Sequence, residues 1–159
     1  MIGKYASFVR YMKTKWQTCP LYVPPISGCT DDEITDIMKG QRVTFLPMLY
    51  REFLKSMGRE DGGLGALNNG ELRYPYIVTF KEMGGYCLPL LTALGVSNNT
   101  FVFMTDNANF LYFFHTYVEE DDPLVYIIRE GISLGVAHEM IGIGSLSYVL
   151  TGLVETCFS

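Results

Sequence analysis

The sequence predicts an α+β fold, with helices in the first half of the chain, an antiparallel sheet in the second half and one closing helix. Apolar residues first recur at helical spacing, and short runs of β-branched and aromatic residues then follow. Aromatic residues make up 14% of the chain, which suits a twisted sheet packed against helices. The chain has 159 residues, so we expect positions 1–159 to form a single domain. A domain of this size can build its core without disulfides or a bound metal ion.

Two helices are predicted before residue 41, separated by a proline-rich connector. The first covers residues 3–16, and its apolar stripe consists of Tyr5, Phe8, Val9, Met12 and Trp16. The second begins at Thr30, whose hydroxyl can cap the first turn, while Glu33 completes a capping box. Gly40 is expected to end this helix, because glycine is the usual residue just after a helix.

A third helix begins near Pro47, since proline is favoured in a first helical turn. Gly58 is expected to end it. The side chains expected to be buried are Tyr50, Phe53, Leu54 and Met57. Residues 59–70 then form a glycine-rich loop, in which we expect little regular structure.

Strands are predicted in the second half of the chain. Residues 74–80 form a candidate strand with Pro75 near its beginning. Residues 100–105 and 110–118 are rich in aromatic and β-branched side chains, and a short turn joins them into an antiparallel hairpin. Residues 124–129 are the third strand of this sheet.

The last part of the chain is predicted to hold a loop and a helix. The Gly-Ile-Gly sequence at residues 142–144 is expected as a loop, followed by a helix over residues 147–156. Residues 132–154 are apolar over a length that could span a bilayer. His138 and Glu139 lie together inside that stretch, so we expect no membrane helix.

One segment carries a family resemblance. LPMLYREFLKSMGREDGG, at residues 46–63, resembles the signature of the SUKH superfamily, in which Leu-Pro opens a helix with an aromatic residue and then Phe-Leu before an Asn-Gly-Gly turn. In this chain Arg59 to Asp61 precede the glycine pair, and the asparagine is missing. Further similar segments are TDDEITDIMKG before it and FVFMTDNANFLYFF, DDPLVYIIREG and SLSYVLTGLVE after it, so that the resemblance covers residues 30–155.

The resemblance implies a SUKH-like fold and a non-catalytic protein that binds another protein. Many members of the superfamily neutralise polymorphic toxins, often nucleases, and are known as immunity proteins. Others are scaffolds for signalling or cell-wall regulation in fungi. We therefore expect an immunity protein, with a regulatory scaffold of the same fold as the alternative.

The motifs of enzymes and metal sites are incomplete in this sequence. After His138 and Glu139, Gly142 stands where a zinc protease has its second histidine. Ser147 replaces the third glycine of a dinucleotide-binding turn, and neither a nucleophile elbow nor a phosphate-binding loop is present. We expect no catalysis, no cofactor and no metal. A small enzyme that pairs a cysteine with His115 or His138 stays open as the alternative.

Charge indicates a protein partner. The formal net charge is −5 and the sequence has no basic cluster of the kind that binds a nucleic-acid backbone, so we expect no nucleic-acid binding. The candidate contact residues are four carboxylates in one loop, Glu119, Glu120, Asp121 and Asp122. Glu60 and Asp61, with Asp31 and Asp32, extend this set if they lie on the same side. We expect a basic partner such as a toxin. A merely solvated loop is the alternative.

The four cysteines, Cys19, Cys29, Cys87 and Cys157, form no Cys-x-x-Cys pair. We expect free, buried thiols. A Cys19–Cys29 disulfide is the alternative if the chain is exported. The first residues lack the continuous apolar run of a signal peptide, which predicts a cytoplasmic location.

Overall fold

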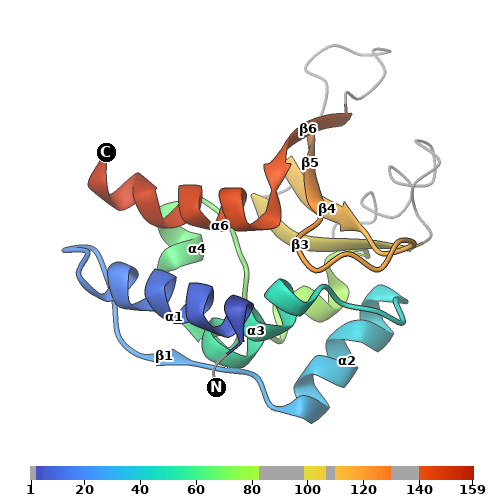
Figure 1. The fold of residues 1–159 in the computed structure, drawn as a ribbon, viewed down its shortest axis with the longest axis horizontal. Helices are drawn as coiled ribbons and strands as arrows, with labels where there is room; N and C mark the ends of the chain where they lie inside the picture. The colour runs from blue at the N-terminus through green and yellow to red at the C-terminus, as the bar shows by residue number, and fades with distance from the viewer. Residues whose placement is uncertain (1–2, 83–98, 107–109, 130–139) are drawn as a thin grey trace.

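The computed structural model describes residues 3–82, 99–106, 110–129 and 140–159, and it confirms the α+β class. The first, third and last long helices lie together on one side, and a four-stranded antiparallel sheet lies beside them (Figure 1). The long helices are α1 (Lys4–Gln17), α2 (Asp31–Gln41), α3 (Met48–Met57) and α6 (Leu146–Glu155). Helix α1 packs against α3 and α6, so the first and last helices are neighbours in space.

The predicted helices form for the predicted reasons. Thr30 and Glu33 make the capping box at the start of α2. Gly40, however, does not end α2. The helix continues to Gln41, and Arg42 takes the left-handed conformation after it. The position requires glycine for another reason, because a Cβ on Gly40 would lie 2.3 Å from the carbonyl oxygen of Val78.

The main sheet consists of β3 (Thr100–Asp106), β4 (Phe110–His115), β5 (Leu124–Arg129) and β6 (Met140–Ser145), in that order. The predicted hairpin is confirmed, because β3 and β4 pair antiparallel. A register shift between Val102 and Met104 interrupts β3, so strict alternation of faces stops there.

Two secondary-structure assignments were wrong, one of a strand and one of a loop. Residues 74–80 contain the 3₁₀ helix η1 (Tyr76–Thr79), which follows a cis peptide bond before Pro75. Residues 142–144, expected as a loop, belong to β6 and pair with β5. The backbone of Gly144 has a φ of 131°, a conformation that glycine alone adopts easily.

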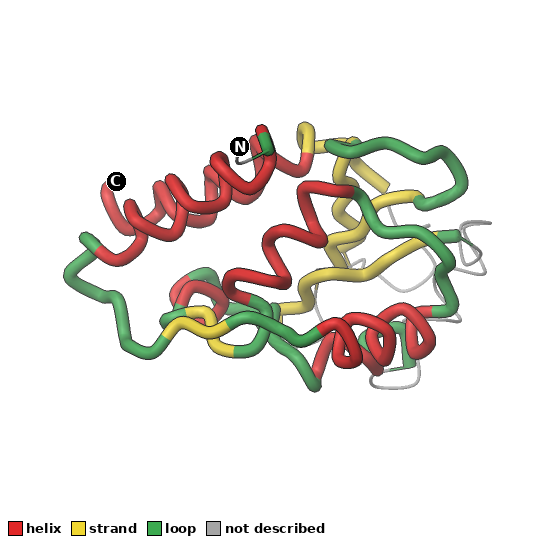
Figure 2. The backbone as a smooth tube through the Cα atoms, turned by 60° about the horizontal axis from the view of Figure 1, so that its bottom comes forward, coloured by secondary structure: helices red, strands yellow, loops and turns green. Residues whose placement is uncertain are grey.

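The glycine-rich segment 59–70 is more regular than expected. It contains the short strand β2 (Glu60–Asp61) and the one-turn helix α4 (Leu64–Leu67). Strand β2 pairs with β1 (Ile26–Ser27), and this pair lies apart from the main sheet (Figure 1, Figure 2). Gly62 and Gly63 between β2 and α4 both have positive φ values, which makes the tight connection possible.

Helix α3 lies at the centre of the core, and its predicted apolar stripe is buried. The ring of Tyr50 meets Phe101 and Phe114 of the sheet edge to face, with ring centroids 5.0 and 5.4 Å away. Trp16 of α1 is buried too, and its indole N–H donates to the Gly62 carbonyl. Helix α3, which follows Leu46 and Pro47, therefore joins the helical layer to the sheet.

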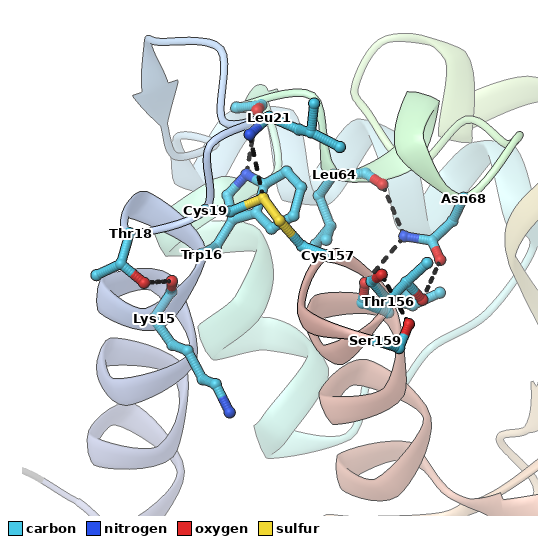
Figure 3. The surroundings of a disulfide bond; sticks show 12 residues. Lys15, Trp16, Thr18, Cys19, Leu21, Leu64, Asn68, Thr156, Cys157 and Ser159 are labelled. Atoms are coloured by element: carbon cyan, nitrogen blue, oxygen red, sulfur yellow. Dashed lines mark hydrogen bonds between the residues drawn. A yellow bond between two sulfur atoms is a disulfide. The ribbon is translucent and has the colours of Figure 1, made fainter.

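The expectation of free thiols was wrong for two of the four cysteines. Cys19, just after α1, forms a disulfide with Cys157 in the 3₁₀ helix η3 (Thr156–Phe158), with Cα atoms 6.1 Å apart (Figure 3). The two ends meet because α1 and α6 are neighbours. Cys29 is a free, buried thiol, as expected, and Cys87 lies outside the described residues.

A peptide map of protein isolated without reductant should recover the Cys19 and Cys157 peptides as one cross-linked species that reduction separates. Cys29 is the internal control. Burial raises the pKa of its thiol to about 12, so it should resist alkylation until the protein is unfolded. Recovery of Cys157 as an alkylated thiol from unfolded, unreduced protein would contradict the disulfide.

The apolar stretch 132–154 is divided between elements rather than forming one long helix. Its described part contains β6 and most of α6, and residues 132–139 lie outside the described residues. None of the described helices has the length and apolarity that crossing a bilayer requires.

Candidate functional site

The four predicted carboxylates lie in the connection between β4 and β5, which contacts the first turns of two helices. The backbone N–H of Leu49 in α3 donates to the Asp121 carbonyl, and the N–H of Leu146 in α6 donates to the Pro123 carbonyl. First-turn N–H groups have no partner inside their own helix. The connection is therefore a shared cap for α3 and α6, which fixes where its side chains point.

The four carboxylates do not play the same role. Asp122 is half-buried, and its carboxylate accepts the backbone N–H of Ser147 at 2.7 Å and the Ser147 hydroxyl at 2.5 Å. Glu119, Glu120 and Asp121 are exposed, and none of these three forms an ion pair with a described residue. Asp122 thus stabilises α6, and three carboxylates are left to face solvent or a partner.

Asp122→Ala should lower the free energy of unfolding by about 1–2 kcal/mol, because it removes a charged cap and leaves a helix N–H unpaired. Glu119→Ala is the matched control in the same loop and should change stability by less than about 0.5 kcal/mol. Urea unfolding of both variants measures the difference. Equal effects would show that Asp122 is as dispensable as its neighbours.

Exposed aromatic and apolar side chains flank the three free carboxylates. Tyr117, Val118 and Leu124 are 64%, 49% and 44% exposed. Together with Glu119, Glu120 and Asp121, they form what we call the acidic–aromatic surface. A small hollow of about 90 Å³ opens here, lined by Glu120, Pro123 and Tyr126 in addition to these apolar residues. Carboxylates beside large apolar groups are suited to contact a basic, partly apolar partner.

His115 also lines the hollow, and two tyrosine rings pack against it. Its ring centroid is 4.9 Å from that of Tyr117 and 5.0 Å from that of Tyr126. Burial lowers the pKa of His115, so the ring is neutral at pH 7. No cysteine lines this hollow, and Cys29 lies at the other end of α3, next to Gly58. His138 and Cys87, the other partners of the enzyme hypothesis, lie outside the described residues.

Glu60 and Asp61 do not extend the acidic–aromatic surface. They follow the C-terminal end of α3, whereas the β4–β5 connection contacts its N-terminal end. The ten residues of α3 put about 15 Å between these two places. Asp61 is also buried, and its carboxylate accepts the N–H groups of Gly63 and Gly65. Its role is to shape the glycine turn, so the condition for extending the acidic run to Glu60 and Asp61 is not met.

Sequence reasoning missed the apolar half of the surface. Residues 110–118 were predicted as one strand, which would have placed Tyr117 and Val118 in the sheet. The strand ends at His115 instead, and both side chains emerge into solvent. The signal that could have shown this is the acidic run itself, because four adjacent carboxylates need a solvated loop that begins before them.

Comparisons with protein-family models, curated proteins and solved structures found no match to this chain. Among the described residues, no group of three or more histidine, cysteine or carboxylate side chains is placed to hold a metal ion.

Proposed function

We propose that this chain is a non-catalytic protein-binding domain whose acidic–aromatic surface docks a basic protein. The observation that carries the proposal is that three exposed carboxylates, none paired with a described cation, lie beside three exposed apolar side chains in the β4–β5 connection and at the start of β5. Interfaces commonly combine large anchoring side chains with charged rims.

The two halves of the surface have separate roles in this proposal. The ring of Tyr117 is 64% exposed and available to an arginine or lysine of the partner, and Glu120 lines the same hollow. Glu119 and Asp121 speed encounter with a positively charged protein, because rim charges act mainly on association. Most of the binding free energy then comes from burial of the apolar side chains.

The resemblance to the SUKH superfamily supports an immunity protein that neutralises a polymorphic toxin, with a regulatory scaffold as the second candidate. A toxin that binds nucleic acid has the basic surface that the carboxylates need. A large toxin gene next to the gene for this chain would favour the immunity role over the scaffold. A pull-down from the native host, read by mass spectrometry, identifies the partner.

A cytoplasmic location belongs to the same proposal, and the disulfide argues against it. Bonds such as Cys19–Cys157 persist in oxidising compartments and are rare in the cytosol. Trapping of thiols in intact host cells decides the matter. Reduced Cys19 and Cys157 in freshly trapped protein would support the cytoplasm, and a quantitative disulfide would refute it.

Glu119→Lys with Glu120→Lys should slow association with the basic partner about tenfold at low salt and flatten its salt dependence. The matched control reverses Asp31 and Asp32, another exposed acidic pair, with the same change in net charge. Tyr117→Ala should mainly speed dissociation. Stopped-flow kinetics at several salt concentrations measures all three. If the control slows association as much as the first variant, the surface has no special role.

A further inference from the structure

A second concave region lies between α1, β1 and α3. Its volume is about 450 Å³, and none of its residues belongs to the acidic–aromatic surface. Four charged side chains line it: Arg10, Lys13, Glu52 and Lys55. We call this region the α1–α3 groove. Cations outnumber carboxylates three to one in its lining, although the whole chain has a net charge of −5.

Glu52 shares the groove with three cations, but no ion pair joins them among the described residues. In the part of the chain that the structure describes, Arg10, Lys13 and Lys55 form no ion pair, and no side-chain hydrogen bond involves them. Elsewhere, Arg59 and Arg73 each bind a carboxylate, Glu33 and Glu71. Like charges brought together in a concave place repel, and a bound anion relieves that repulsion.

Regular elements hold the groove in shape. Arg10 and Lys13 are three residues apart on α1, as are Glu52 and Lys55 on α3, so each pair shares one helix face. Gly28 closes the third side. A Cβ at Gly28 would lie 1.7 Å from the carbonyl oxygen of Lys55, so only glycine allows the end of β1 to lie this close to α3. Sites built on helices keep their geometry better than sites on loops.

The charges and donors of the groove fit a phosphomonoester. Three cations and one carboxylate leave a formal charge of +2, which balances a group that carries about −1.5 to −2 at pH 7. The guanidinium of Arg10 can bind two phosphate oxygens at once, and the lysines add point charges. Ser56 contributes a hydroxyl to the lining.

We infer that the α1–α3 groove binds a phosphomonoester, carried by a free phosphorylated small molecule or by a phosphorylated side chain of another protein. The inference is independent of the proposed function, because the acidic–aromatic surface contributes nothing to the groove. Titration of ¹⁵N-labelled protein with inorganic phosphate, at constant ionic strength set by chloride, tests it. We expect a dissociation constant on the order of 1 mM, with amide shifts confined to the groove lining.

Matched variants separate a site from general charge. Lys55→Gln should weaken phosphate binding about fivefold, whereas Lys39→Gln on exposed α2 should leave it unchanged. Glu52→Gln should tighten binding about fivefold, and Glu119→Gln, with the same change in net charge, should not. The spectra report at the same time that each variant is folded.

A phosphoserine peptide and glucose 6-phosphate, titrated in the same way, tell the two sources apart, because the true source should bind at least tenfold tighter than phosphate alone. Shifts spread over all basic residues, or equal effects within either matched pair, would overturn the inference.

Discussion

Phe53→Ala is expected to lower the free energy of unfolding by about 3–5 kcal/mol, one of the two largest effects we foresee. Phe53 is 1% exposed in α3, and its ring lies 6.0 Å from that of Tyr50, which in turn contacts the sheet. Truncation removes the buried ring and leaves a cavity that the rigid helix and sheet cannot close. Urea or thermal unfolding monitored by circular dichroism measures the loss.

Phe158→Ala makes the same chemical change at a position that is 44% exposed, so it should cost less than about 1 kcal/mol. The comparison isolates burial from side-chain chemistry. A Phe53→Ala cost as small as that of the control would mean that the register of α3 is wrong. The SUKH resemblance would then lose its strongest segment, because the Leu-Pro helix is expected to carry core residues.

The features that the sequence predicted well depend on residues close together in the chain. The capping box needs only Thr30 and Glu33, which are three positions apart. The β3–β4 hairpin needs two aromatic runs that lie close together in the chain. In both cases the physical cause lies within a few residues, so a local pattern contains most of the information.

The elements that were missed depend on distant neighbours. Strand β6 contains two glycines, which weaken a strand signal. Its place is secured by antiparallel pairing with β5, in which Gly142 lies opposite Tyr126. The Cys19–Cys157 disulfide spans 138 residues, and no spacing rule could single out this pair.

The candidate site divides in the same way. The acidic run was visible in the sequence as a charged loop, but the role of Asp122 depends on Ser147, 25 residues further on. The burial of Asp61 depends on the fold of the glycine turn that follows it. Sequence therefore located the carboxylates, and only tertiary contacts separated the structural ones from those free to bind.

Gln41 is a further case of a role that only tertiary structure reveals. It is completely buried at the end of α2, next to β3, the strand at one end of the described sheet order. Its side-chain amide donates to the carbonyls of Val102 at 2.7 Å and Ile77 at 2.8 Å, and its oxygen accepts the Val102 N–H at 3.0 Å. The side chain thus pairs with Val102 as a neighbouring strand would, and it covers part of the sheet edge.

Gln41→Leu should therefore lower the free energy of unfolding by about 2–4 kcal/mol. The leucine has nearly the same volume, but it leaves the N–H and the carbonyl of Val102 without the partner they have here, and each such group costs about 1–3 kcal/mol, with incomplete additivity. The Ile77 carbonyl keeps the N–H of Phe80 as a donor. Gln17→Leu, on the exposed end of α1, is the matched control and should stay within about 0.5 kcal/mol. Urea unfolding gives both values, and hydrogen exchange at the Val102 amide should speed up in the first variant alone. If Gln41→Leu leaves the free energy of unfolding unchanged and the Val102 amide stays protected from exchange, the backbone polar groups at this edge do not depend on the glutamine. Packing alone must then hold β3 in place.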